Sequence, residues 1–256
     1  MAHRPDVSLL RPSQIASQRR LVSSYLSNYR CGWLGCAYAR IMNVVDVWPL
    51  FGLSLSSPRL QMRIVRDEDI PALLEAVYAG VHDPAVMPFA VPWTDAAPDE
   101  LRRNFAQHQW RQRLNVQPNN WTLNLAVILN GVPIGIQDMS AVDFSVRQTV
   151  SSGSWLTRRH QGAGLGTEMR AAMLMFAFDH LGAEVAESGA ATWNAASLGV
   201  SRRLGYTDNG ISRAAPRPGQ AVEEQRLRLL RDDFRRPSWK LRVEGLDAAR
   251  RDLLSP

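Results

Sequence analysis

A glycine-rich turn between a predicted strand and a predicted helix limits the fold more than any other feature of this sequence. It lies in "RRHQGAGLGTEMRAAMLMF", residues 158–176, and contains Gly162, Gly164 and Gly166. Glycine lets the main chain approach a ligand closely and adopt conformations that other residues avoid. The free N–H groups of the helix and the positive end of its dipole favour an anion such as pyrophosphate at the turn. The helix itself is predicted to bury one face, made of Met169, Ala172, Met173 and Phe176.

Two common nucleotide-binding motifs do not fit this turn. The dinucleotide motif G-x-G-x-x-G, counted from Gly162, requires a third glycine where the chain has Thr167. The phosphate loop of nucleoside triphosphatases requires Gly-Lys-Ser/Thr, and no lysine is near the turn. The pattern that fits is Gln-x-x-Gly-x-Gly, formed by Gln161, Gly164 and Gly166.

Charge and composition restrict the class of protein. The chain has 256 residues, 45% of them hydrophobic, and it lacks an apolar run long enough to cross a membrane or a clear secretory signal. We therefore expect a cytoplasmic protein with no membrane segment. The net charge of +6 is concentrated in residues 1–41, which contain six arginines and only one acidic residue, Asp6. The remainder carries no strong basic field, so nucleic acid is not an expected partner of the main domain.

The two cysteines do not predict a metal site. Cys31 and Cys36 lie in "CGWLGC", and His3 is the only histidine near them. A structural zinc ion needs about four such ligands. We interpret the cysteines as reduced thiols and expect no metal.

Residues 1–41 show no core pattern and are predicted to form a loose basic extension, followed by a domain over 42–235 and a tail over 236–256. Within the domain, Asn130-Gly131 between two apolar strand patterns predicts a hairpin. The expected order is strand 60–65, helix from Pro71, helix 99–114, the hairpin, strand 144–157, helix 167–182, strand 184–191, helix 194–204 and two closing strands. This order predicts an α/β (α+β) fold, a mixed sheet of about six to seven strands with helices on both faces.

Three segments together resemble a known family. "SPRLQMRIVRDEDIPALLEA", "GSWLTRRHQGAGLGTEMRAAM" and "NAASLGVSRRLGY", which begins at Asn194, are similar in order and spacing to the GNAT superfamily of acyl-CoA N-acyltransferases. The similarity covers about residues 42–235 and is strongest to the RimJ/RimL-like branch, which acetylates protein N-termini and small amines. It implies the GNAT fold, acetyl-CoA as co-substrate, and a primary amine of a small molecule or a protein N-terminus as acceptor. Attack is expected within a ternary complex, and a homodimer is one assembly that the family allows.

The resemblance implies where acetyl-CoA binds. The strand before the turn diverges from its neighbour in this family, and the pantetheine arm lies in the gap, bonded to the main chain of Trp155, Leu156 and Thr157. Asn194 is expected to bond the same arm from the start of the next helix, with Ser197 nearby, and it could also cap that helix. The pyrophosphate is expected on the turn, at Gln161, Gly162, Ala163, Gly164, Leu165, Gly166 and Thr167.

The catalytic residues are less well specified by the sequence. An amine attacks only as its free base, and the departing thiolate needs a proton. Many relatives place a tyrosine seven positions after the asparagine, where this chain has Ser201, so Ser197 is the predicted proton donor. Glu187 is the predicted base, with alternatives at Asp138, Glu223 and Glu224.

The acceptor is expected to enter past the loop between the first two helices. Phe89 and Trp93 on this loop, with Asp138 on the hairpin, are the candidate acceptor residues, and a small aromatic core is the alternative role of the two rings. Two other functions remain open. One is an acyl-CoA sensor of the same fold without turnover, and the other is a nucleic-acid-associated protein that uses the arginine-rich residues 1–41.

Overall fold

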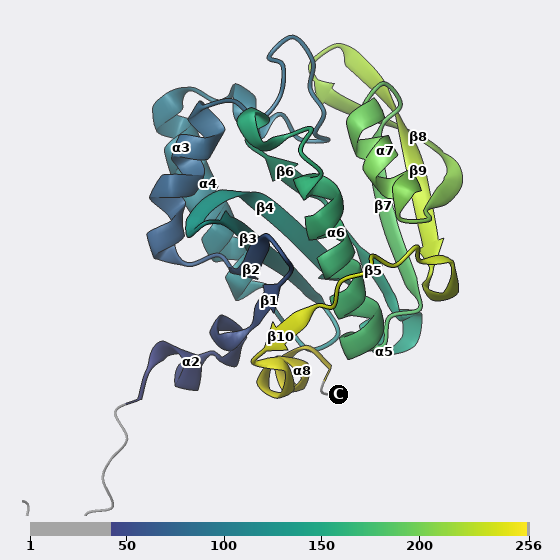
Figure 1. Ribbon diagram of the computed structural model, residues 1–256. Helices are drawn as coiled ribbons and strands as arrows, with labels where there is room; N and C mark the ends of the chain where they lie inside the picture. Colours follow the sequence, from purple (N-terminus) through teal and green to yellow (C-terminus); the bar gives the residue numbers. More distant parts are fainter. Residues whose placement is uncertain (1–41, 255–256) are drawn as a thin grey trace, which may run out of the picture. The chain divides into compact units, whose positions relative to one another are not determined.

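The computed structural model describes residues 42–254 and contains one mixed β-sheet with helices on both faces (Figure 1). The strand order is β10-β1-β2-β3-β4-β5-β7-β9-β8, with β6 paired to β4. The predicted basic extension and the two cysteines lie outside the described residues. No helix within residues 42–254 is long and apolar enough to span a bilayer.

The described residues form ten strands and seven α-helices, numbered in chain order. The strands are β1 (Ser54–Ser56), β2 (Leu60–Ile64), β3 (Trp121–Leu129), β4 (Val132–Ala141), β5 (Thr149–Ser151), β6 (Ser154–Leu156), β7 (Val185–Ala191), β8 (Thr207–Arg217), β9 (Gln220–Leu230) and β10 (Arg242–Glu244). The helices are α2 (Val44–Val47), α3 (Ile70–Tyr78), α4 (Pro98–Leu114), α5 (Phe144–Arg147), α6 (Leu165–Met175), α7 (Ala195–Arg203) and α8 (Leu246–Leu254). A π-helical turn, Phe176–Leu181, continues α6.

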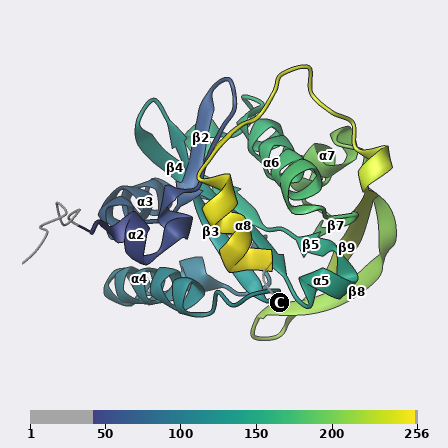
Figure 2. The same ribbon diagram turned by 90° about the horizontal axis from the view of Figure 1, so that it is seen from below.

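The sheet separates two hydrophobic cores. One face of β3 and β4 is covered by α3 and α4, which bury Leu73, Val77 and Phe105 against it. The other face is covered by α6 and α8, which lie side by side when the molecule is seen from below (Figure 2). The predicted face of α6 is confirmed, since Met169, Ala172, Met173 and Phe176 are all buried.

The hairpin forms where the sequence predicts it. Asn130 and Gly131 adopt left-handed conformations, with φ of 50° and 80°, which match a tight two-residue turn between twisted strands. The register of β3 on β4 runs from Trp121 opposite Ala141 to Leu129 opposite Val132. This hairpin carries the strand against which the candidate site is built.

Four sequence predictions need correction. The sheet has ten strands rather than six to seven, because β1 and β10 extend its edge and residues 149–156 divide into β5 and β6. The stretch Phe144–Arg147 is a helical turn, not part of a strand. Helix α6 begins at Leu165, because the left-handed Gly164 leaves the helical path just before it. The spacing of Trp110 with Leu101 and Phe105 in the helix 99–114 predicts that all three are buried, but Trp110 is 46% exposed, and its indole N–H donates to Asp67 instead.

Residues 236–256 are not a tail in the sense predicted. Strand β10 pairs antiparallel with β1, and α8 places Ala249 and Leu253 in the core without any exposed surface. The main-chain carbonyl of Leu253 also accepts a hydrogen bond from Asn119 at 2.9 Å. The sequence did not predict this packing, because the apolar pattern of α8 is short and the residues that it contacts lie far away in the sequence.

We expect Leu253→Ala to lower the free energy of unfolding by about 2–4 kcal/mol, because it removes a fully buried side chain and leaves a cavity. Arg250→Ala, on the exposed side of the same helix, is the matched control and should change it by less than about 0.5 kcal/mol. Urea unfolding of both variants measures the difference. Equal small effects would show that α8 is only loosely docked.

Candidate active site

The sheet splits within the strand that precedes the glycine turn. Strand β5 pairs with β4 on one side and, in parallel, with β7 on the other, where Ser151 lies opposite Glu187. The last hydrogen bond across to β7 runs from the Ser152 N–H to the Glu187 carbonyl at 3.2 Å. Beyond it, β6 pairs only with β4, and β7 pairs only with β9. A strand-wide split therefore opens between β6 and β7.

The hydrogen bonds of β6 decide which main-chain groups face the split. The Thr157 N–H donates to Ile134, and its carbonyl accepts from His160, both at 2.9 Å. Both groups are used, so Thr157 cannot offer the main-chain contact predicted for it. Successive residues of an antiparallel strand alternately direct their main-chain N–H and C=O groups toward the partner strand and away from it. The main-chain groups of Trp155 therefore face β4, whereas the N–H of Leu156 faces the split. Of the three predicted residues, Leu156 is the one with a suitably directed donor.

A glycine marks the start of the split. The Gly153 N–H donates to Asp138 Oδ1 at 2.7 Å, so the side chain of Asp138 takes a bond that a main-chain carbonyl would otherwise accept. A Cβ at position 153 would lie 2.6 Å from Asp138 Oδ2, closer than real Cβ contacts allow. A larger residue at position 153 would therefore displace the carboxylate of Asp138, which the Gly153 N–H holds at the point where β6 leaves β7.

The glycine turn presents a row of free donors. Gly162 and Gly164 have φ of 75° and 79°, in the left-handed region. Among residues 42–254, no acceptor bonds the six consecutive N–H groups from Gly162 to Thr167. Successive N–H groups of this kind form a concave anion site, and the dipole of α6 adds positive potential to it. The predicted pyrophosphate turn thus has the donors that its proposed ligand needs.

The side chain of Gln161 supports the turn from inside. Its Nε2 donates to the carbonyls of Val81 and Leu156, each at 2.8 Å. The amide therefore joins the turn to β6 and to the segment after α3. Gln161 contributes to the predicted ligand site by shaping the turn, because its amide nitrogen already donates to two carbonyls.

Glu168, which sequence reasoning missed, anchors the start of α6. Its Oε1 accepts from Ser57 Oγ (2.7 Å) and the Arg59 N–H (2.9 Å), and its Oε2 accepts from Arg59 Nε at 2.6 Å. Arg59 also donates to the carbonyl of Ala163 at 3.0 Å. Burial alone would raise the pKa of Glu168, but the bonds from Ser57 and Arg59 outweigh it and lower the pKa. The only sign of this role in the sequence is an acidic residue in the first turn of a helix, and that feature is common to many helices.

The start of α7 combines a helix cap with unused polar groups. Asn194 Oδ1 accepts from the Ser197 N–H at 3.1 Å, so the capping role is confirmed. Neither the Asn194 amide nitrogen nor the Ser197 hydroxyl donates to any other described residue. Ser201, which stands where many relatives have tyrosine, is fully buried, and its Oγ has no hydrogen-bond partner in the described range. Its burial rules it out as a group that reaches substrate.

Phe89 and Trp93 lie beside β6 rather than in an open pocket. Their ring centroids are 5.3 Å apart, and Trp93 lies 5.9 Å from Trp155 and 6.2 Å from Phe105. Both residues are half-buried against the core of α3 and α4. The structure supports their alternative role as a small aromatic core that forms one wall of the site.

A cavity of about 380 Å³ lies where β4, β5, β7, β8 and β9 run together. Its lining includes three carboxylates from three strands, Asp138, Glu187 and Glu224, together with Arg226. Ala186 on β7 packs in the core beneath α6, so by strand alternation Glu187 points to the opposite face. The cavity thus lies across the sheet from α6, and it brings together the predicted base, Glu187, and two of its alternatives, Asp138 and Glu224.

Burial raises the pKa of Asp138, while its bond from Gly153 and the charge of Arg170 act in the opposite direction. A carboxylate whose pKa is raised accepts a proton more readily than an ordinary carboxylate. The side chain of Glu187 is half-buried and has no hydrogen-bond or ion-pair partner in the described part of the chain. Both carboxylates line the cavity, and Asp138 is the more firmly held.

An ion pair joins the β8–β9 hairpin to the loop between α3 and α4. Arg217 donates from Nε and Nη2 to the two carboxylate oxygens of Asp95, at 2.6 and 2.8 Å, and from Nη2 to the Pro84 carbonyl at 3.1 Å. Both segments extend beyond the same end of the sheet (Figure 1). The bond from Arg217 lowers the pKa of Asp95, so the pair stays charged over the neutral range.

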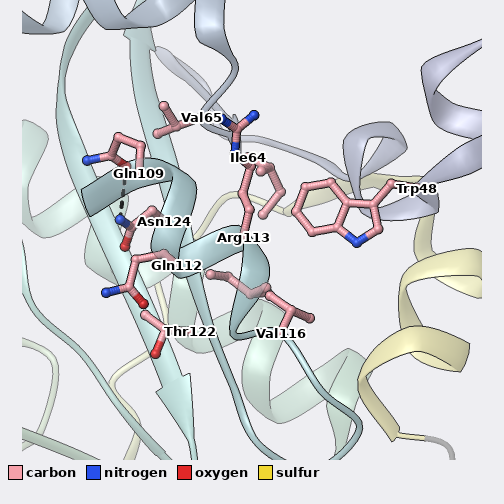
Figure 3. A pocket seen from close by; sticks show the side chains of 10 residues that line it. Trp48, Ile64, Val65, Gln109, Gln112, Arg113, Val116, Thr122 and Asn124 are labelled. Carbon is pink, nitrogen blue, oxygen red and sulfur yellow. Dashed lines mark hydrogen bonds between the residues drawn. The ribbon is translucent and has the colours of Figure 1, made fainter. Parts of the chain in front are cut away.

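A second hollow, between α4 and β3, is too small to be the site. It holds about 10 Å³, which is room for roughly one water molecule. Figure 3 shows Gln109 and Asn124 bonded to each other on one side of it, with Trp48 on the opposite side. Within residues 42–254, no three histidine, cysteine or acidic side chains gather closely enough to hold a metal ion.

Comparison with known families identifies the architecture. The sequence profile of the acetyltransferase (GNAT) domain matches residues 59–207, which is more than half of the chain. The chain belongs to the GNAT acetyltransferase family. It is therefore an acyltransferase of a family that uses acetyl-CoA, and the match includes the split, the glycine turn and the start of α7.

Solved structures show the same fold. Mycobacterium smegmatis RimJ in complex with CoA-disulfide has a TM-score of 0.62 at 16% identity, over 73% of this chain and 91% of that one. The RimL ribosomal L7/L12 alpha-N-protein acetyltransferase has 0.53 at 18%, over 68% and 91%. A GCN5-related N-acetyltransferase from Brucella melitensis has 0.55 at 18%, over 70% and 79%. These likenesses confirm the predicted fold class.

We expect Gly164→Ala to weaken coenzyme A binding by more than about tenfold, equivalent to about 1.4 kcal/mol. The added methyl group has open space around it except for Arg59 Nη2 at 3.5 Å, and the left-handed φ of 79° is strained for alanine. Gly182→Ala is the matched control, because Gly182 has φ of 82° and open space but lies at the far end of the helix.

Calorimetric titration with coenzyme A and thermal melting of both variants separate strain from ligand contact. Both variants should lose a similar amount of stability, about 1–2 kcal/mol, because the left-handed conformation is the same. Only Gly164→Ala should lose affinity. Equal affinity in the two folded variants would rule out the turn as the phosphate site.

Proposed function

We propose that this protein transfers the acetyl group of acetyl-CoA directly to a primary amine, within a ternary complex formed at the split. The observation that carries the proposal is the arrangement around Gly153. A row of free N–H groups lies at the start of α6, and a carboxylate-lined cavity lies across the sheet from that helix. A phosphate-bearing thioester and a cationic amine could therefore approach the same point from opposite faces.

The residues present fit acetyl-CoA. The N–H groups from Gly162 to Thr167 suit its pyrophosphate, and the Leu156 N–H suits an extended amide chain that replaces the missing strand. The free amide nitrogen of Asn194 could donate to the same arm from the other side of the split. Bound acetyl-CoA supplies an activated acyl carbon whose thiolate leaves readily.

The proposed reaction conserves atoms and charge. The lone pair of the amine nitrogen forms a bond to the acyl carbon, and the carbon–sulfur bond breaks with its electron pair on sulfur. The amine attacks as its free base, so an acceptor that arrives as an ammonium group first releases one proton to water. The nitrogen then gives up one proton to a carboxylate in the cavity, which passes it on to water, and the thiolate gains a proton to leave as the free thiol of coenzyme A. We assign the transfer to the carboxylate to Asp138, with Glu187 as the second candidate, and the protonation of sulfur to Ser197, which regains a proton from water.

The acceptor class follows from the cavity charge. Three carboxylates outnumber the single Arg226 among the residues that line it, so a positively charged ammonium group is favoured over an acid. The RimL structure is named for an α-N-protein acetyltransferase, and a peptide amino terminus is one acceptor with this chemistry. Small-molecule amines have the same reactive group.

A panel of acceptors tests the function. We expect release of coenzyme A with peptides that have a free amino terminus or with cationic small amines, and much slower release with acidic amines of similar size. The same peptides with a blocked amino terminus are the control. Mass spectrometry should find one acetyl group on nitrogen. Tight coenzyme A binding without turnover on any amine would instead indicate a non-catalytic acyl-CoA sensor.

The pH dependence of kcat should distinguish the two candidate bases. A base must be deprotonated, so kcat falls as the pH drops through its pKa in the complex. We expect Asp138→Asn to lower kcat by about 10²–10⁴-fold and to remove the acidic limb that the raised pKa of Asp138 produces. Glu187→Gln should lower kcat far less and keep that limb.

The two variants and the parent are measured with one acceptor, so that its own ionisation is common to all. The opposite result, with the limb lost in Glu187→Gln, would assign the base to Glu187. An unchanged limb in both variants would assign proton removal to water.

A further inference from the structure

Arg170 is a buried charge with no carboxylate of the described residues in direct contact, although its field acts on Asp138. It lies on α6, is 4% exposed, and takes part in no ion pair among residues 42–254. Its three contacts are neutral, namely Ser188 Oγ at 3.0 Å, Ser154 Oγ at 3.2 Å and Gln137 Oε1 at 3.4 Å. Burying a cation without a direct ion pair is unfavourable. The charge of Arg170 is therefore available to interact with negative charge on a bound ligand.

The contacts of Arg170 span the split. Ser154 belongs to β6 and Ser188 to β7, the two strands that separate after Ser152. The guanidinium group therefore bonds both sides of the split from the α6 face. Its third contact, Gln137, donates from Nε2 to the carbonyls of Asp138 and Gly153, both at 2.9 Å. One side chain thus reaches β6, β7 and the hydrogen-bonded pair at the start of the split.

Other buried polar groups gather at the same place. The Ser152 Oγ and the Tyr206 hydroxyl make no hydrogen bond of ordinary geometry within residues 42–254, but they lie close to each other and to Arg170. Burial raises the pKa of Tyr206, while the charge of Arg170 and the polar contacts with Ser152 and Arg170 act in the opposite direction. The Ser188 hydroxyl continues the network by donating to the Ser152 carbonyl at 3.4 Å. The region under the split is therefore polar and positively charged, although it is closed to solvent.

We propose that Arg170 is a positioning residue for acetyl transfer. It holds β6 and β7 at a fixed separation, and its charge stabilises the negative charge that develops on the acyl oxygen and the departing sulfur. It acts through Ser154 and Ser188 and through its field, without touching substrate. A fixed charge in a buried site acts strongly, because water does not screen it. The inference rests on the proposed binding of acetyl-CoA in the split.

The test compares Arg170→Met, which removes the charge at similar volume, with Arg170→Lys, which keeps it. We expect Arg170→Met to lower kcat by about thirtyfold or more while coenzyme A affinity changes less than about threefold. Arg170→Lys should recover at least a third of the parent kcat, because the charge remains. Arg236→Met is the matched control, since Arg236 pairs with Asp179 at the surface near the other end of the long helix. It should leave kcat unchanged.

Three results would overturn the proposal. One is a parent-like kcat in folded Arg170→Met, and another is a lysine variant no faster than the methionine variant. The third is a loss of coenzyme A affinity equal to the loss of kcat, which indicates a purely structural role. If Arg170→Met does not fold, Ser188→Ala takes its place. It should lower kcat about threefold to tenfold at unchanged affinity, and an unchanged kcat would overturn the proposal.

Failure of the underlying function looks different. If acetyl-CoA does not bind at the split, Gly164→Ala keeps full coenzyme A affinity, whatever the result at Arg170. If Gly164→Ala loses affinity and Arg170→Met keeps its rate, only the inference about Arg170 is refuted.

Discussion

The hydrogen bond from the Ser152 N–H to the Glu187 carbonyl is the last one that joins the two halves of the sheet on the side of the split. The position of every later feature of the site depends on where the hydrogen bonds between β5 and β7 end. One residue further, Gly153 donates its N–H to Asp138, and a side chain at this position would push that carboxylate away. The strand then follows β4 alone. A ligand with amide groups can occupy the place that a neighbouring strand would otherwise take, because the donors of β6 on that side have no partner.

The parts of the site are fixed before any ligand arrives. Glu168 joins α6 to the residues before β2, and Gln161 joins the turn to β6 and to the segment after α3. These bonds hold the free N–H groups of the turn in one orientation. Because little conformational freedom is then left to lose, binding can use most of its interaction energy for affinity. The aromatic rings of Trp93 and Trp155 stiffen the other side of β6 in the same way.

Local signals in the sequence predicted local structure well. The hairpin at Asn130-Gly131, the glycine turn and the cap of α7 each depend on a few adjacent residues, and each was confirmed as structure. Contacts between distant residues were not predictable. The hydrogen bond between Glu168 and Arg59 joins residues that are 109 positions apart in the sequence. The hydrogen bonds of Arg170 depend on β4, β6 and β7 being assembled. Residues 236–256 were misjudged for the same reason, since β10 pairs with β1 across almost the whole domain.

Thr157 and Trp110 show the limits of pattern reasoning at single positions. The family resemblance indicated the right strand but could not tell which residues turn their main chain toward the split, because that depends on register. Spacing placed Trp110 on an apolar face, yet Asp67 gives its indole a partner at the surface.

The pairing of β10 with β1 has a consequence for the synthesis of the chain. Strands from near the beginning and near the end of the described polypeptide meet at one edge of the sheet, far along the strand order from the split between β6 and β7. The outer edge of β1 therefore stays unpaired during synthesis until residues 242–244 have been made, and an unpaired strand edge can pair with another chain.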